Sequence, residues 1–287
     1  MRKSVHIIYN PAAGSAKPKL ISRATRKLQN FGMAVSVEET AGPNMAGAMA
    51  QNATADILVA AGGDGTVREV IDGLADTEKS LAIFPMGTAN VLAAEMGLKP
   101  DVDAVVNTIR YGIARPLHLG TVNGQHFAVM ASIGFDADVV ADVSLPLKKW
   151  IGRFAYVIEA MRQLIIFRPK NFTLNIDGID YQCGGAIISN GKYYGGKFIC
   201  APSAQVTDAR LQICLLRSSN RIDIMNYVIA LNLGKFPKCT GVQVLEGHKF
   251  KIDGPRAVLQ ADGDIIGHSP ITIVGKASQG FSLVMPV

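Results

Sequence analysis

The chain has 287 residues, 48% of them hydrophobic and 18% charged, which are globular values with ample material for one large or two moderate domains. No uncharged apolar run is long enough to cross a bilayer and no signal peptide is visible, so we expect a cytoplasmic protein rather than an integral membrane protein. A formal net charge of +6 favours anionic partners; because no nucleic-acid-binding motif is present, a nucleotide or an acidic membrane surface is preferred to nucleic acid.

Strands and helices alternate over the first 115 residues. Apolar runs predict strands at residues 5–9, 35–37, 57–61 and 81–84, and helical periodicity predicts helices at residues 20–31, 45–51, 88–96 and 102–111. In the first helix one face carries Leu20, Ala24, Leu28 and Phe31, the other carries Lys19, Arg23, Arg26 and Lys27, and Gly32 is placed to end it. The alternation predicts a doubly wound, Rossmann-like parallel sheet with ligands at the carboxyl ends of its strands.

The pattern changes near residue 115. Asn123-Gly124 and Asp177-Gly178 each separate two apolar runs, which is a strong hairpin signal. Further strands are expected at residues 198–201, 211–216, 242–245, 249–252, 258–260 and 271–274, with helices near 151–167 and 222–233. We therefore assign residues 1–115 to a nucleotide-binding α/β domain and 116–287 to an antiparallel β-sandwich, whose last strand is able to return to the first domain. The widely spaced cysteines lack metal-site spacing and are expected to be reduced: Cys183, Cys200, Cys214 and Cys239.

The loop after the third strand, Gly62-Gly63-Asp64-Gly65-Thr66, carries the clearest chemical signal. Its three glycines remove Cβ atoms that would keep backbone amides away from an anion, and consecutive amides at a helix N-terminus bind phosphate. Asp64 would repel phosphate unless it meets Mg²⁺ or takes a proton from an attacking hydroxyl. The alternative is an ordinary turn with Asp64 as a helix cap, but five specified positions after a clean strand favour a nucleotide phosphate site.

Two more loops, at residues 10–15 and 85–90, fall at the same edge of the predicted sheet. In the second loop Gly87 allows close approach, and Thr88 can cap the following helix while reaching a phosphate. Either loop alone would be ordinary turn chemistry. Three glycine-bearing loops at one edge, one of them with a bare Asp, favour a nucleotide site.

The second half contributes acidic residues: Asp136, Asp208, Asp262 and Asp264. An isolated Asp262-Gly263 is usually a hairpin turn. Two carboxylates that flank a glycine are also able to hold Mg²⁺ or to position a base.

The ordered series of motifs resembles the diacylglycerol kinase catalytic-domain family of lipid kinases. The matching residues are Asn10-Pro11 with Gly14, the glycine loop with Glu69-Val70, Pro85-x-Gly87-Thr88-x-Asn90, Gly134-Phe135-Asp136-Ala137, Ala201-Pro202, Asp208 and Asp262-Gly263. The resemblance implies an ATP- and Mg²⁺-dependent kinase that transfers the γ-phosphate to the hydroxyl of diacylglycerol or a related lipid. It also implies a first domain similar to those of NAD kinases and phosphofructokinases.

The resemblance assigns roles to individual residues. Asp64 and Asp262 are the two candidates for the catalytic base, and the sequence does not decide between them. Asp136 is expected to contact the lipid substrate, and Asp208 and Asp264 to hold Mg²⁺. The expected nucleotide-binding residues are Asn10, Pro11, Gly14, Thr40, Gly62, Gly63, Gly65, Thr66, Gly87, Thr88 and Asn90.

Two departures from the family pattern affect the expected Mg²⁺ site. Ala209 stands where the family usually has Gly, so it would be strained if that turn needs a positive φ. Asp264 stands where the family has Glu and is one methylene shorter, enough to lose a direct metal contact. These departures motivate one alternative, a non-catalytic nucleotide- or lipid-binding regulator; an NAD kinase-like enzyme is the other.

A basic and aromatic segment at residues 145–154, which includes Trp150, has the composition of a segment at a membrane interface. The alternative is a core-packed helix start with a solvated basic end. We expect peripheral association with the inner face of the membrane, where the lipid substrate resides. Exposed strand edges of the β domain would allow a homodimer.

Overall fold

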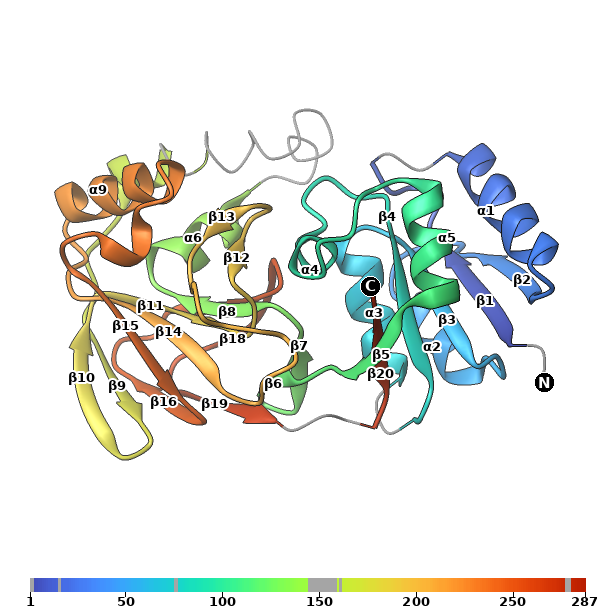
Figure 1. The fold of residues 1–287 in the computed structure, drawn as a ribbon. Coiled ribbons are helices and arrows are strands. Elements are labelled where there is room, and N and C mark those ends of the chain that lie inside the picture. The colour runs from blue at the N-terminus through green and yellow to red at the C-terminus, as the bar shows by residue number, and fades with distance from the viewer. Residues whose placement is uncertain (1–2, 15–16, 75–76, 144–158, 160–161, 277–279) are drawn as a thin grey trace. The chain divides into compact units, whose positions relative to one another are not determined.

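The computed structural model describes residues 3–14, 17–74, 77–143, 159, 162–276 and 280–287. The chain forms two compact units, one of Met1–Leu117 with Ser278–Val287 and the other of His118–Ala277 (Figure 1). The predicted interfacial segment at residues 145–154 lies outside the described residues, as does most of the helix expected near 151–167. No helix among the described residues is long and apolar enough to span a membrane.

The first unit contains a six-stranded sheet in the order β2-β1-β3-β4-β20-β5. Its strands are β1 (Ser4–Tyr9), β2 (Ala34–Glu39), β3 (Ile57–Gly62), β4 (Ser80–Pro85), β5 (Ile113–Pro116) and β20 (Ser282–Met285). All neighbours pair in parallel except β20 and β5, which pair antiparallel. β3 is buried at every position, as its continuous apolar run predicts for a central strand covered on both faces.

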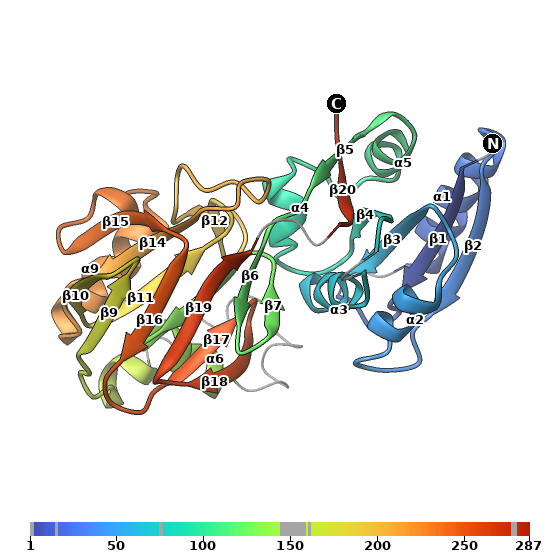
Figure 2. The same cartoon turned by 90° about the horizontal axis from the view of Figure 1, so that it is seen from below.

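Helices cover both faces of this sheet. They are α1 (Pro18–Asn30), α2 (Ala46–Asn52), α3 (Asp64–Leu74), α4 (Val91–Glu95) and α5 (Val102–Tyr111). The chain reverses its direction across the sheet after β2, so right-handed crossovers place α1 on one face and α2 with α3 on the other (Figure 2). The predicted Rossmann-like, doubly wound sheet is confirmed.

Two predicted helices differ in detail. The buried face of α1 is formed by Ile21, Ala24 and Leu28. Phe31 lies just past the end of the helix and is 46% exposed, and the Arg110 guanidinium lies over its ring, 3.7 Å from the ring centroid. α4 begins at Val91 rather than at residue 88, since Asn90 has a left-handed φ of 49° that a helix does not tolerate.

The second unit is a sandwich of two six-stranded antiparallel sheets, in the orders β10-β9-β16-β19-β6-β7 and β15-β14-β11-β8-β17-β18, plus the pair β12-β13. The strands are β6 (Leu119–Val122), β7 (Gln125–Phe127), β8 (Met130–Ile133), β9 (Phe172–Ile176), β10 (Ile179–Cys183), β11 (Gly185–Ser189), β12 (Tyr193–Tyr194), β13 (Phe198–Ile199), β14 (Leu211–Leu216), β15 (Val242–Gly247), β16 (Lys249–Asp253), β17 (Val258–Ala261), β18 (Asp264–His268) and β19 (Ile271–Lys276). Side chains from both sheets, among them Phe172, Phe250 and Leu259, form one buried core. This confirms the predicted antiparallel sandwich.

Helices α6 (Phe135–Asp142) and α9 (Arg221–Asn232) and the short 3₁₀ helix η1 (Phe236–Lys238) lie outside the two sheets. Both predicted hairpins are present: Asn123-Gly124 has φ of 49° and 81°, and Asp177-Gly178 has φ of 48° and 97°, as two-residue type I′ turns require. The four cysteines are free thiols, as expected. The short elements β5, β12 and α6 were not predicted, because they are too brief to show a periodicity.

Candidate functional site

The three predicted loops of the first unit meet at one edge of its sheet. β1, β3 and β4 are parallel, so the loops that follow them share the carboxyl edge. The Asn10 amide Nδ2 donates to Thr66 Oγ1 at 2.9 Å, and the Met86 amide donates to the Gly62 carbonyl at 2.8 Å. These contacts tie the first loop to the glycine loop and the glycine loop to the third.

The glycines of these loops differ in why a side chain would be unfavourable at their positions. A Cβ on Gly87 would lie 2.5 Å from Gly63 Cα, and a Cβ on Gly62 would lie 2.5 Å from Thr66 Oγ1, so both positions need glycine for the loops to pack. Gly65 differs, because a Cβ there would meet no protein atom within 4 Å. The space beside Gly65 is therefore open to a bound group.

Asp64 is half-buried and begins α3. Its carboxylate accepts hydrogen bonds from the backbone amides of Asn90 at 2.8 Å and Val91 at 2.6 Å, at the start of α4. Asp64 is thus a helix cap, but for α4 rather than for its own helix, and the expectation that Thr88 caps the helix after β4 is wrong. These charge-assisted bonds fix the carboxylate in place beside the glycine loop.

Further nucleotide-binding candidates lie in the first and third loops, on either side of the glycine loop. The Asn10 carbonyl Oδ1 accepts from the Ala12 amide at 2.9 Å, which makes an Asx turn through the exposed Pro11. A Cβ on Gly14 would lie 3.4 Å from Thr88 Oγ1, so the first and third loops approach each other here.

Two other nucleotide-binding candidates, Asn90 and Thr40, make hydrogen bonds that hold the backbone of the first unit. The Asn90 side chain closes its own loop, since its Oδ1 accepts from the Gly87 amide at 2.7 Å and its Nδ2 donates to the Gly87 carbonyl at 2.9 Å. Thr40 is buried beyond the end of β2, where its amide donates to the Tyr9 carbonyl at 2.8 Å.

Glu69 has a role that sequence reasoning missed. Its carboxylate oxygens accept from the backbone amides of Asn44 and Ala46, each at 3.0 Å, immediately before and at the start of α2. The residue was part of the matched motif, but only the fold shows that it holds the loop that precedes α2.

Asp136 of the second unit lies in the first turn of α6, and its side chain is partly buried. It accepts hydrogen bonds from the Ser132 and Tyr194 hydroxyls and from Gln260 Nε2 at 3.3 Å. Burial raises the pKa of Asp136 above its usual value, and the hydrogen bonds from Ser132, Tyr194 and Gln260 offset part of the rise. Gln260 is the cross-strand partner of Ser132 and also donates to its hydroxyl at 2.8 Å.

Sequence reasoning missed these three partners. Ser132 precedes Asp136 by four residues and Gln260 precedes Asp262 by two, so a search around the predicted acids would have reached both. No spacing in the sequence points to Tyr194.

Asp262 and Gly263 form a two-residue turn between β17 and β18 with φ of 46° and 89°, so the hairpin interpretation is correct. The carboxylate also accepts from three successive amides, those of Ala128 at 2.6 Å, Val129 at 2.9 Å and Met130 at 3.0 Å. Asp262 therefore anchors the chain between β7 and β8, and its charge is held at a defined position.

Asp208 forms an ion pair with Arg210, a side chain of its own loop. Arg210 Nη2 lies 2.9 Å from Asp208 Oδ2, and Arg210 Nη1 lies 3.3 Å from Glu246 Oε2. Mainly through its hydrogen bonds, Arg210 lowers the pKa of Asp208 to about 2. Ala209 has no positive φ, so the loss of the family's glycine causes no strain there.

These residues do not fit a Mg²⁺ ion bound by the second unit alone. The Arg210 guanidinium already supplies positive charge to Asp208, and Asp264 lies exposed on β18. Across the part of the chain that the structure describes, no group of three or more His, Cys, Asp or Glu side chains is placed to hold a metal.

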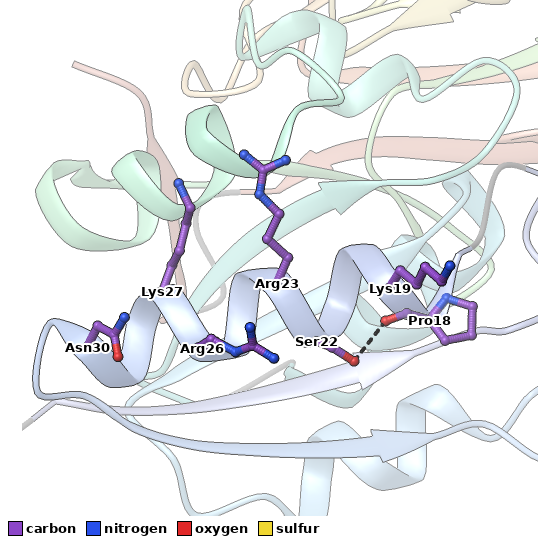
Figure 3. A pocket seen from close by; sticks show the side chains of 7 residues that line it. All are labelled: Pro18, Lys19, Ser22, Arg23, Arg26, Lys27 and Asn30. Carbon is purple, nitrogen blue, oxygen red and sulfur yellow. Dashed lines mark hydrogen bonds between the residues drawn. The ribbon is translucent and has the colours of Figure 1, made fainter.

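A basic groove of about 630 Å³ follows the outer face of α1 (Figure 3), lined by Pro18, Lys19, Ser22, Arg23, Arg26, Lys27 and Asn30. Two of its cations, Arg23 and Lys27, pair with Asp103 of α5. The glycine-bearing loops do not line it, so the groove is a charged helix face apart from the candidate phosphate site.

Comparison with known proteins matches both halves of the chain. The model of the diacylglycerol kinase catalytic domain matches residues 4–122, and that of the YegS C-terminal NAD kinase beta sandwich-like domain matches residues 129–283. The diacylglycerol kinase of Bacillus subtilis (strain 168) is 29% identical over 280 residues, 93% of this chain and 92% of that protein. A "Probable lipid kinase YegS-like" of Pseudomonas aeruginosa (strain UCBPP-PA14) is 38% identical over 165 residues, 55% of this chain and 54% of that protein. A crystal structure of a diacylglycerol kinase from Bacillus anthracis str. Sterne shares the fold, with a TM-score of 0.78 and 22% identity over 99% of this chain and 97% of that one.

Proposed function

Because the chain belongs to the family of lipid kinases that join a diacylglycerol kinase catalytic domain to a YegS C-terminal domain, it is a lipid kinase, and we propose that it transfers the γ-phosphate of ATP to the hydroxyl of diacylglycerol or a related lipid. Family membership favours this activity over that of an NAD kinase-like enzyme.

The meeting of three loops around a fixed carboxylate is the observation that carries the proposal. The open space beside Gly65 leaves the N-terminus of α3 accessible to phosphate, and the α3 dipole favours negative charge there. Gly63 and Gly87 bring two loops into contact, which directs their backbone toward one place. In this proposal Asn10, Pro11, Gly14, Thr40, Gly62, Gly63, Gly65, Thr66, Gly87, Thr88 and Asn90 form or support the nucleotide site.

Asp64 fits a Mg²⁺ ion that is held chiefly by ATP phosphates. The Asn90 and Val91 amides hold its two carboxylate oxygens in place, and a carboxylate offers about four lone-pair sites in all. Mg²⁺ is commonly held by one or two carboxylates together with substrate phosphates, and when bound it would neutralise phosphate charge. The Asp208 and Asp264 positions are not needed for this arrangement.

The second unit offers a place for the lipid hydroxyl. Asp136 is a partly buried acceptor surrounded by the donors Ser132, Tyr194 and Gln260, a group suited to recognise a hydroxyl. Asp262 is held rigidly by three amides. Asp64 or Asp262 is proposed as the base that takes the hydroxyl proton, since a carboxylate at a fixed position can accept it as the phosphoryl group transfers.

The test is transfer of labelled phosphate from ATP to a panel of lipid hydroxyls in detergent micelles with Mg²⁺. The panel contains diacylglycerol, a sphingoid base, ceramide, a prenol and NAD. We expect one labelled lipid, strong loss of product in both Asp64→Asn and Asp262→Asn, and full activity in Asp72→Asn, an exposed acid at the other end of α3. A product on NAD alone would overturn the proposal, and bound ATP without any product would indicate a regulator.

Because the proposed substrate resides in a bilayer, we also propose peripheral association with the inner face of the membrane. The cytoplasmic location and the homodimer expected from exposed strand edges stay predictions. Sedimentation velocity of the purified protein measures the second directly.

A further inference from the structure

Helix α9 lies outside the two sheets of the second unit (Figure 1) and carries a stripe of large, exposed apolar side chains. The exposed fractions are 75% for Ile222, 47% for Met225, 50% for Ile229 and 65% for Leu233, which directly follows the helix. These positions follow the spacing i, i+3, i+7 and i+11, so they share one side of the helix. Contiguous apolar surface of this kind marks an interaction site in a folded protein.

The opposite side of α9 packs firmly on its own unit. Ile224 and Tyr227 are buried, and Ile224 belongs to a small core with Phe135, Val139 and Phe167. The exposed stripe is therefore a second apolar face on a helix that already has a core contact. Next to Phe167, Ile165 and Ile166 are also exposed, at 72% and 53%.

Positive charges stand at both ends of the stripe. Arg221 begins the helix, and Lys235 and Lys238 follow it; all three are exposed. The single acid of the helix, Asp223, pairs with the N-cap residue Asn220: its backbone amide donates to Asn220 Oδ1 at 2.8 Å, and its carboxylate accepts from Asn220 Nδ2 at 2.6 Å. Apolar side chains between cations are the pattern of a helix that lies in the headgroup region of an anionic bilayer.

We propose that the α9 stripe is the surface with which this kinase docks on an anionic membrane, an inference that rests on the proposed lipid kinase function. Ile222, Met225, Ile229 and Leu233 enter the boundary between headgroups and acyl chains, while the flanking cations contact anionic headgroups. A second copy of the chain is a poorer partner, since two α9 helices paired about a twofold axis would bring cations against cations in either direction.

Within the second unit, α9 packs against the helix that carries the proposed substrate residue Asp136. The Phe135 and Phe167 rings contact edge to face with centroids 5.3 Å apart, and Ile224 of α9 joins the same core. Phe135 and the proposed substrate residue Asp136 are neighbours in the first turn of α6. Docking α9 would therefore bring α6 close to the surface from which the lipid hydroxyl comes.

Vesicle co-sedimentation tests the proposal with the full chain. The vesicles contain phosphatidylcholine with phosphatidylglycerol, and the variant is Ile229→Glu with Leu233→Glu. Both side chains are exposed, so the fold is expected to survive, which circular dichroism checks. Each replacement should weaken vesicle binding about tenfold, because a large apolar side chain loses its burial. The matched control is Ile179→Glu, an equally exposed position (62%) in the β9–β10 hairpin, and it should bind as the wild type does.

Activity on a monodisperse short-chain diacylglycerol separates this inference from the proposed function. If the stripe docks on membranes, the double variant keeps that activity and loses activity on vesicles. Unchanged vesicle binding by the folded double variant would overturn the inference, and a change from dimer to monomer with unchanged vesicle binding would assign the stripe to a second copy. A wild type that binds vesicles through α9 but phosphorylates no lipid would overturn the kinase chemistry alone.

Discussion

At the scale of single residues, both proposed catalytic acids have a structural task. Asp64 caps α4 with two amide bonds, and Asp262 accepts three amides of the chain between β7 and β8. Such a carboxylate is positioned without a metal or a substrate. Loss of activity after its replacement can therefore come from disorder as well as from lost chemistry, and the two effects need separate measurements.

Asp64→Ala is expected to lower the free energy of unfolding by about 1 kcal/mol, because the first amides of α4 lose their cap. Asp64→Asn keeps one carbonyl acceptor and should lose less stability while still losing the proposed chemistry. Denaturant unfolding of both variants measures the difference, with Asp72→Asn as control. Equal stability of Asp64→Ala and the wild type would show that the cap contributes nothing.

Gly65→Ala separates the needs of the fold from the needs of a ligand. A methyl group at this position meets no protein atom within 4 Å, so thermal stability should change little. If phosphate lies against the loop, the same methyl group should raise the KM for ATP severalfold. Gly42→Ala, which also meets nothing within 4 Å, is the matched control and should leave KM unchanged. A normal KM in Gly65→Ala would remove this loop from the phosphate site.

At the scale of elements, the sequence predicted correctly those turns and helix ends that depend on residues adjacent in the chain. The glycine loop, the two predicted hairpins and the end of α1 at Gly32 all depend on residues that need a special φ or leave space, and these are visible in the sequence. The start of α4 was placed too early, because nothing local shows that Asn90 is left-handed or that Asp64 provides its cap. Tyr194 was missed since only the fold brings it to Asp136, 58 residues away.

In the loop between β13 and β14, an arginine side chain pairs with Asp208, the residue at which the resemblance leads us to expect Mg²⁺. Arg210 supplies the charge that pairs with Asp208 and Glu246, so the second unit should not depend on Mg²⁺. Thermal unfolding without nucleotide is expected to be the same in EDTA and in Mg²⁺. A lower midpoint in EDTA would contradict this.

The ion pair also predicts a dependence on acid. The pKa of Asp208 is lowered from 3.8 to about 2, so its contribution to stability is present above pH 4 and is lost as the pH falls toward 2. Arg210→Ala should remove this part of the acid dependence. Its effect at neutral pH should be small, because both side chains are well exposed. Urea unfolding across this pH range measures both.

At the scale of the whole molecule, the first unit is built from two distant parts of the chain. β20 lies between β4 and β5; Leu283 of this strand and Phe281, which directly precedes it, are both fully buried in the first unit. Losing one such side chain typically costs 2–5 kcal/mol, against roughly 5–15 kcal/mol for the stability of a domain. Deletion of residues 278–287 should therefore unfold the first unit and abolish ATP binding, although every loop of the nucleotide site is retained.

Isothermal titration with ATP and hydrogen exchange of residues 57–74 measure this loss. A chain that lacks only residues 286–287, where Val287 is 91% exposed, is the control and should bind ATP normally. Protected amides and normal ATP binding in the longer deletion would show that β20 is dispensable.

The late position of β20 also sets the order of events during synthesis. Residues 117–281 separate β5 from β20, and at roughly 5–20 residues per second a ribosome needs on the order of 10 to 30 s to make them. Throughout that interval β4 and β5 each have an unpaired edge. Such an edge can pair with a strand of another chain, so it must be covered by the growing chain itself or by a chaperone. A message broken anywhere in this stretch yields a product that contains every phosphate-binding loop and still lacks a completed sheet, so the cell gains either a whole kinase or none.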